Sequence, residues 1–184
     1  MTDAPALTIS HVVLHCFDIE KMIDFYSRVL GLRMTDDGRI GSDDYNGARI
    51  AFFSCDPRDH HQLALTEGRT AEKGSVLLHQ ISFRHDSLAR LRSLKERLDA
   101  EGGAEITPAN HGTHWSIYFF DPEGNRIEAF VETPWYVKQP VWSDLDLAQS
   151  DAEIEAATKA RFGDDPSFRR LDEWRAEFAR EAAS

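Results

Sequence analysis

The chain has 184 residues, 41% of them hydrophobic and 29% charged, so it is long enough to bury a core and has the composition of a soluble globular protein. Acidic residues outnumber Lys and Arg by 32 to 21, and the net charge of −11 argues against a nucleic-acid surface or an anionic membrane as partner. The sequence shows no apolar run of membrane-spanning length, no signal-peptide pattern and only two cysteines without zinc spacing, which predicts a reduced, cytoplasmic protein.

The first half of the chain is expected to form a strand, a helix and three more strands. Residues 8–16 alternate in character and are rich in β-branched side chains, which predicts a strand. Asp18 is a typical N-cap for a helix over residues 19–30, whose apolar positions keep helical spacing and which Gly31 would end. The rest of this half is expected to be the start of a strand, a polar turn and two further strands, at residues 32–34, 36–47, 48–54 and 62–66.

A polar, glycine-containing linker over residues 67–75 separates this half from the next, where the same pattern starts again. Residues 78–83 predict a strand, and residues 88–100 predict a helix. Residues 110–132 indicate two β-favouring strands joined by a turn at 121–125, where proline fixes φ and glycine can take a positive φ.

The first strand and helix of the second half line up with those of the first half without a gap. When His11 is placed over Gln80, apolar positions of the first strand and helix fall on apolar positions of their second-half counterparts, which indicates an internal duplication. Each half is then a βαβββ module that is too small to bury its own sheet face. We therefore expect an α+β fold in which two tandem βαβββ modules, about 8–66 and 76–132, form one curved mixed sheet around a shared cleft.

The last part of the chain changes in character. Residues 133–142 are rich in proline and aromatic side chains and are expected to lie over the body of the domain. Residues 150–153 are a capping-box signature for one helix, and Asp165-Pro166 is expected to open a second, amphipathic helix. We expect one domain over residues 8–142 and a C-terminal helical extension over 143–184, with a role as lid, packing strap or dimer contact left open.

Polar side chains interrupt the otherwise apolar strands. A carboxylate such as Glu128, in the middle of RIEAF, has to be paired, bound to a metal or turned to solvent. His11, at the start of an apolar strand, is either a core histidine or a ligand, while His114 indicates a loop residue. The duplication places His11 and Gln80 at equivalent positions of the first strands. It places Ala64 and Glu128 at equivalent positions of the last strands, so these four side chains are expected to converge on the cleft.

The chain resembles the vicinal oxygen chelate superfamily, which includes glyoxalase I, bleomycin-resistance proteins and the type I extradiol dioxygenases. The resemblance covers about residues 8–142 and is carried, in this order, by SHVVLHC, DPRDHHQLAL, LLHQISF, the NHG turn and SIYFFDPEGNRIEAF. Within the superfamily it is strongest to the catalytic domain of extradiol catechol dioxygenases, particularly catechol 2,3-dioxygenase. The last of these segments is the most specific.

These dioxygenases hold Fe(II) with two histidines and a glutamate and leave positions open for catechol and O₂. The resemblance implies that His11, the residue at position 80 and Glu128 bind iron, or another divalent metal, in the cleft. The family has a histidine where this chain has Gln80. Gln80 ligates, or His79 substitutes for it through a bulge in the strand, or neither does. Ala64 cannot supply a fourth ligand, which speaks against the four-ligand isomerase and epimerase branches.

The resemblance also implies three catalytic residues. His61 would act first as general base and then as general acid, because imidazole titrates near neutral pH. His111 and Tyr118 would hydrogen-bond the oxygens of the substrate. Alternatively, His61 is a solvated turn residue and Tyr118 a core aromatic.

We expect an Fe(II)-dependent extradiol-type ring-cleavage dioxygenase that uses O₂ to open a catechol-like aromatic, and, by analogy with the superfamily, a homodimer. Two alternatives stay open. One is another metal-dependent enzyme of this fold, an isomerase or lyase, and the other is a non-catalytic protein that binds a small aromatic molecule.

Overall fold

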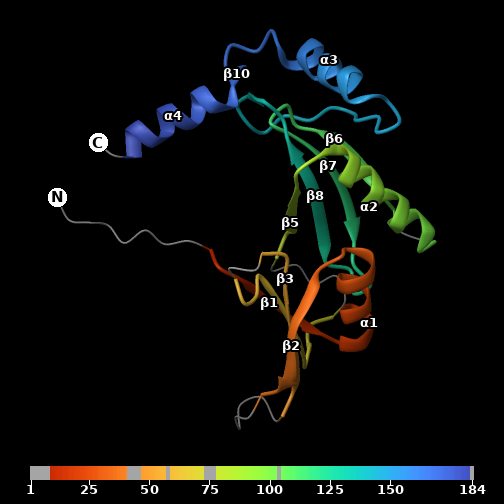
Figure 1. The fold of residues 1–184 in the computed structure, drawn as a ribbon. Helices are drawn as coiled ribbons and strands as arrows, with labels where there is room; N and C mark the ends of the chain where they lie inside the picture. Colours follow the sequence, from red (N-terminus) through yellow and green to blue (C-terminus); the bar gives the residue numbers. More distant parts are fainter. Residues whose placement is uncertain (1–8, 41–46, 57–58, 73–77, 103–104, 183–184) are drawn as a thin grey trace, which may run out of the picture. The chain divides into compact units, whose positions relative to one another are not determined.

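The computed structural model describes residues 9–40, 47–56, 59–72, 78–102 and 105–182 (Figure 1). The chain divides into two units, and each has its own four-stranded mixed sheet. The first unit consists of Met1–Val76 and the turn Asp121–Gly124. The second unit consists of Leu77–Phe120 and Asn125–Ser184.

The first unit contains, in chain order, β1 (Val12–Cys16), α1 (Ile19–Asp24), the π-helical turn η1 (Phe25–Val29), β2 (Arg33–Arg39), β3 (Arg49–Ser54) and β4 (Leu63–Glu67). Its strands lie in the order β1-β4-β3-β2. β1 and β4 run parallel, whereas the other neighbouring strands are antiparallel. α1 packs against β4, where Met22 and Leu65 are fully buried.

The repeated part of the second unit contains β5 (Ile81–His85), α2 (Leu88–Ala100), β6 (Thr107–Asn110), β7 (His114–Phe120) and β8 (Arg126–Glu132). Its strands lie in the order β5-β8-β7-β6, again with the outer pair β5 and β8 parallel and the other pairs antiparallel. This order repeats the first unit element for element. The tandem βαβββ modules of an α+β fold that the sequence predicts are confirmed.

Strand register confirms the alignment of the two halves at single-residue level. In the first unit Ala64 of β4 stands opposite Phe52 of β3. In the second unit Glu128 of β8 stands opposite Tyr118 of β7. Ala64 also pairs with Val13 of β1, and Glu128 with Ser82 of β5. Because Val13 and Ser82 are equivalent in the repeat, Ala64 and Glu128 occupy the same place in their modules.

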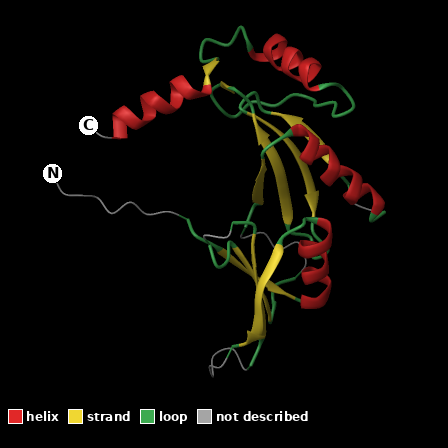
Figure 2. Ribbon diagram, viewed as in Figure 1, coloured by secondary structure: helices red, strands yellow, loops and turns green. Residues whose placement is uncertain are grey.

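α2 begins and ends where its periodicity predicts. Its buried side chains recur every three or four residues, and it lies along one face of its sheet, in contact with β5, β7 and β8 (Figure 2). These buried side chains are Leu88, Leu91, Leu94 and Leu98.

The first helix differs from the expected single α-helix over 19–30. Asp18 caps it as predicted, since its Oδ1 accepts the backbone N–H of Lys21 at 3.0 Å. After Asp24, however, the backbone widens into a π-helical turn that runs through Phe25–Val29. The apolar spacing of this segment does not distinguish the two helix types, because both bury the same face here.

β2 is longer than the sequence indicates. Residues 36–39, expected to begin a polar turn, continue the strand and pair with β3, with a register shift between Met34 and Asp36. All seven residues of β2 are exposed, so no apolar alternation marks the strand. Residues 41–46 of the expected turn lie outside the described part of the chain.

The C-terminal part of the second unit contains β9 (Trp135–Tyr136), α3 (Asp151–Phe162), β10 (Arg169–Arg170) and α4 (Leu171–Ala182), with β9 and β10 paired antiparallel. Ser150 forms the predicted capping box of α3. The last helix begins at Leu171 and not at Asp165-Pro166, which lie in the preceding turn. The rings of Tyr136 and Trp174 stack at 4.8 Å between centroids. Within the described ranges, no helix is long and apolar enough to cross a membrane.

Candidate metal centre

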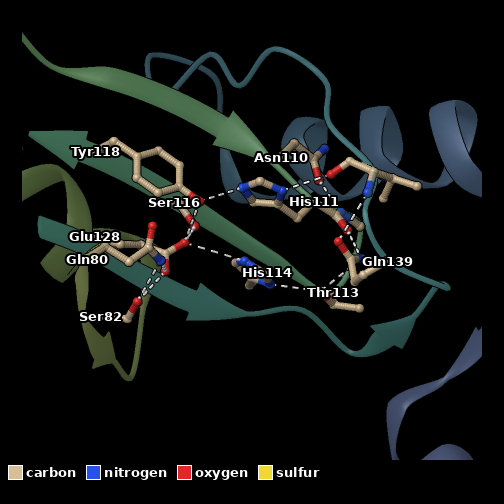
Figure 3. A network of polar contacts seen from close by, with 12 residues as sticks. Gln80, Ser82, Asn110, His111, Thr113, His114, Ser116, Tyr118, Glu128 and Gln139 are labelled. Atoms are coloured by element: carbon tan, nitrogen blue, oxygen red, sulfur yellow. Dashed lines mark hydrogen bonds and ion pairs between the residues drawn. The ribbon is translucent and has the colours of Figure 1, made fainter. Parts of the chain in front are cut away.

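Glu128 lies on the face of the second-unit sheet that points away from α2. Its neighbours along β8, Ile127 and Ala129, are buried, and side chains alternate between the two faces of a strand. Polar side chains from the neighbouring strands gather on the same face (Figure 3). They are Gln80 and Ser82 at the start of the module, and His114, Ser116 and Tyr118 on β7.

Both carboxylate oxygens of Glu128 accept hydrogen bonds. Oε1 accepts from the hydroxyls of Ser116 at 2.8 Å and Tyr118 at 2.7 Å. Oε2 accepts from the hydroxyl of Ser82 at 2.6 Å and from the amide nitrogen of Gln80 at 2.9 Å. Glu128 is only 5% exposed, so the interpretation that it faces solvent is wrong.

The carboxyl of Glu128 stays ionised in this buried position. Burial raises its pKa, but hydrogen bonds from His114, Ser82, Tyr118 and Ser116 outweigh burial and hold the pKa well below its ordinary value. A buried carboxylate of this kind requires either hydrogen-bond donors or a cation beside it.

His111 lies in the turn between β6 and β7, and both of its ring nitrogens have partners. Nδ1 donates to the carbonyl of Val141 at 2.8 Å, and Nε2 lies 2.9 Å from the hydroxyl of Tyr118. Burial lowers the pKa of His111 and so favours the neutral ring. Burial and the neighbouring Glu128 raise the pKa of Tyr118. Tyr118 is therefore a neutral hydroxyl between a carboxylate and an imidazole.

The turn that carries His111 is held by the segment that follows β8. The side chain of Asn110 accepts from the N–H of Gly112 at 2.9 Å and donates to Thr158 of α3 at 2.9 Å. Gln139 donates to the carbonyl of His111 at 2.8 Å. Gly112 has φ +71°, and a Cβ there would lie 2.4 Å from a valine side chain of the same segment. The C-terminal part thus positions the site, a role that the sequence did not indicate.

His114 was expected in a loop and instead begins β7, on the face of Glu128. Its ring stacks on His111 at 4.5 Å between centroids. Its Nε2 lies 3.5 Å from Oε1 of Glu128, and its Nδ1 lies 2.8 Å from the hydroxyl of Thr113. The signal that could have found it is alternation, because positions 114, 116 and 118 share one face of a strand.

His111, His114 and Glu128 form a cluster whose ligand atoms all lie within 4.8 Å of one another. Two imidazoles and one carboxylate are a donor set that suits divalent first-row transition metals such as iron and zinc. A neutral His111 and an ionised Glu128 have the protonation states that ligation needs. The residues present therefore fit a divalent metal.

Gln80 holds Glu128 through a hydrogen bond. Its amide nitrogen donates to Glu128 and, at 3.0 Å, to Ser82. Because a carboxylate only accepts hydrogen bonds, it is the amide nitrogen and not the amide oxygen of Gln80 that faces it. His79 is directed elsewhere, with its Nε2 3.2 Å from the guanidinium of Arg126.

His11 and His61 belong to the first unit, where they contact each other. Their ring centroids are 4.2 Å apart, and Nδ1 of His61 lies 2.9 Å from Nδ1 of His60. Burial, with the neighbouring rings of His11 and His60, lowers the pKa of His61. The predicted site residues that the structure brings together in the second unit are Gln80, His111, Tyr118 and Glu128.

Comparisons with known proteins agree with this architecture. The profile of the Glyoxalase/Bleomycin resistance protein/Dioxygenase superfamily matches residues 8–129. Biphenyl-2,3-diol 1,2-dioxygenase 2 of Rhodococcus globerulus is 28% identical over 175 residues, which cover 86% of this chain and 86% of that one. Metapyrocatechase of Pseudomonas sp. (strain CF600) is 31% identical over 165 residues, which cover 85% of this chain and 50% of the relative.

The fold is shared with a solved glyoxylase/bleomycin resistance protein/dioxygenase domain from Frankia sp. EAN1pec. The TM-score is 0.57 at 24% sequence identity, over 70% of this chain and 99% of the Frankia domain. At this identity the likeness concerns the fold alone.

Proposed function

We propose that this chain, which belongs to the Glyoxalase/Bleomycin resistance protein/Dioxygenase superfamily, is an Fe(II)-dependent extradiol-type ring-cleavage dioxygenase for a small catechol-like aromatic. The observation that carries the proposal is the buried, ionised Glu128, with the hydroxyl of Tyr118 and two imidazoles beside it. The name of the Rhodococcus relative, a biphenyl-2,3-diol dioxygenase, supports the same reaction class.

Glu128 is the anionic metal ligand in this proposal, and the sequence resemblance adds His11 and Gln80 as its fellow ligands. When bound, Fe(II) would supply coordination positions for the two catechol oxygens and for O₂ and a path for electrons between them. In this proposal, side chains of the protein carry out the proton transfers and hold the substrate.

Proton handling is proposed for three side chains. His61 is unprotonated at neutral pH because its pKa is lowered, so it can accept the proton of a catechol hydroxyl and return it later. Tyr118, whose pKa is raised, stays a neutral donor to a substrate oxygen that carries negative charge. His111 fixes Tyr118 from the other side at 2.9 Å.

Aromatic side chains beside the site support an aromatic substrate. Trp142 stacks on the ring of Tyr118 at 5.6 Å between centroids and lies edge-on to His111 at 4.9 Å. It is nevertheless 44% exposed, so part of its surface is open to a flat ligand.

The test is O₂ uptake by anaerobically purified, iron-loaded protein with a panel of catechols. We expect consumption of O₂ together with the visible absorbance of a ring-opened semialdehyde, and loss of both in Glu128→Gln. Glu132→Gln, four residues further along β8 on the same strand face, is the matched control and is expected to keep activity. Iron-loaded wild type that consumes no O₂ with any catechol contradicts the proposal.

A metal-dependent isomerase or lyase is the second candidate. Gln80 favours it, because an amide stands where the dioxygenases have a histidine. Turnover that requires the metal and leaves O₂ unconsumed would select this candidate over the first.

A further inference from the structure

We propose that His114 is a metal ligand of this chain and takes the place of Gln80 in the ligand set. The inference deepens the proposed function, on which it rests for the presence of a metal, and names a side chain that the family resemblance does not assign. It follows from four features of the second unit.

The first feature is the orientation of Gln80. Its amide nitrogen is engaged with Glu128 at 2.9 Å and with Ser82 at 3.0 Å. An amide can bind a metal only through its oxygen, and this oxygen is the end that does not face the carboxylate. Gln80 is therefore placed to position Glu128.

The second feature is the orientation of His114. Its Nε2 faces Oε1 of Glu128 at 3.5 Å, while its Nδ1 lies 2.8 Å from the hydroxyl of Thr113. Metal-binding histidines characteristically give the N–H of their second ring nitrogen to an oxygen of the protein, which fixes the tautomer and the ring. Nε2 donates to Glu128 when no metal is bound, whereas in the tautomer with its hydrogen on Nδ1 Thr113 accepts that hydrogen and Nε2 presents its lone pair to a cation beside Glu128.

The third feature is the number of polar hydrogens available for the hydrogen bonds around His111. Its Nδ1 carries a hydrogen, because the carbonyl of Val141 at 2.8 Å only accepts. The Nε2 of the neutral ring is then an acceptor, and it competes with Glu128 for the single hydroxyl hydrogen of Tyr118. One of these two short contacts lacks a hydrogen, so the cluster holds a lone pair that a cation can use.

The fourth feature is the size and accessibility of the cluster. Two ligands on one metal, each bonded at about 2.1 Å, stand at most about 4.2 Å apart. The observed limit of 4.8 Å among His111, His114 and Glu128 requires only small side-chain rotations. His114 also lines a pocket of about 240 Å³ with Phe130 and Trp174, which gives an ion a path to the cluster.

The proposal is tested by placing a thiol at the candidate position and adding Co(II). A cysteine bound to Co(II) produces a sulfur-to-metal charge-transfer band in the near ultraviolet. The background is Cys55→Ser, which removes the exposed native cysteine. The other, Cys16, is buried, and burial raises the pKa of its thiol to about 12, so it remains protonated.

We expect the band to appear in His114→Cys, to saturate at one Co(II) per chain, and to be absent from the background protein. Absence of the band in a folded His114→Cys variant overturns the proposal, and the same band in Gln80→Cys alone would return position 80 to the ligand set. Circular dichroism establishes that each variant is folded.

Co(II) affinity supplies a second measurement. His114→Gln is expected to weaken binding on the order of 100-fold or more, because loss of even an outer-shell partner costs 10–100-fold. His85→Gln, in the same unit but on the α2 side of β5, is the matched control. Unchanged affinity in His114→Gln overturns the proposal. Neither measurement uses catechol or O₂, so a chain that binds Co(II) through position 114 but consumes no O₂ loses only the dioxygenase assignment.

Discussion

Tyr118 and Glu128 stand directly opposite each other on β7 and β8, and the phenol hydroxyl donates to the carboxylate at 2.7 Å. Directly opposed residues of an antiparallel pair have their Cβ atoms about 4.5–5.5 Å apart, so strand register fixes this contact. The same hydroxyl lies 2.9 Å from His111, and the pair therefore links the carboxylate to an imidazole.

Removal of this hydroxyl is expected to destabilise the protein. Tyr118→Phe keeps the ring and its stacking on Trp142 but leaves Glu128 and His111 each without one polar contact. We expect the free energy of unfolding to fall by about 1–3 kcal/mol, measured by urea denaturation. Tyr136→Phe is the control, and an equal loss in both variants would assign the effect to tyrosine removal in general.

The buried hydroxyl of Thr158 is expected to matter for the site as well as for stability. It accepts from the side chains of Asn110 and Trp115, both at 2.9 Å. Thr158→Val leaves two buried N–H groups unsatisfied, so we expect a loss of about 2–4 kcal/mol in thermal or urea unfolding. Co(II) affinity should fall too, because Asn110 holds the turn that carries His111. Thr158→Ser should restore both, and a stable Thr158→Val would contradict the prediction.

Glu123 is expected to be a carboxylate on which the stability of the first unit depends. It accepts from the backbone N–H groups of Phe17 at 2.6 Å and Asp18 at 2.8 Å, and it pairs with Arg69 at 3.2 Å. The side chains of this ion pair are 8% and 5% exposed. Glu123→Gln leaves a buried guanidinium without its counter-charge, for which we expect a loss of about 3–5 kcal/mol on urea unfolding. Asp24→Asn, which breaks an exposed ion pair of α1, should change stability little.

His85 is expected to make the protein less stable in mild acid. Burial lowers its pKa, and the nearby charges of Arg97 and Arg90 lower it further. The unfolded chain therefore binds a proton near pH 6.5, while the folded chain resists it, so the free energy of unfolding falls as pH drops below 6.5. The fall ends once the folded ring is also protonated. His85→Gln should reduce the difference in stability between pH 7.5 and pH 5.5, and an unreduced difference would contradict this.

The repeat and α2 could be predicted because the buried faces of these elements leave a periodic apolar pattern. Glu128 could be singled out because a carboxylate inside such a pattern needs a partner. The extension of β2 could not be predicted from the sequence, because both of its faces are exposed. The bonds that tie Asn110 to Thr158 and His111 to Gln139 could not either, since they join distant segments through side chains of common types.

His114 was missed for a different reason. The strand was recognised from its apolar residues, which begin after the histidine, so its first residue was assigned to a loop. Extension of the same alternation by two residues from Ser116 places His114 beside Glu128.

Phe52 and Ala64 of the first unit occupy the positions that Tyr118 and Glu128 occupy in the second. The same backbone frame therefore accepts an apolar pair in one copy and a charged, hydrogen-bonded pair in the other. The strand frame of this molecule and the chemistry of the side chains on it are therefore separable, because one copy carries an apolar pair on this frame and the other carries a carboxylate. The double substitution Phe52→Tyr and Ala64→Glu would introduce the same tyrosine–carboxylate pair into the first unit.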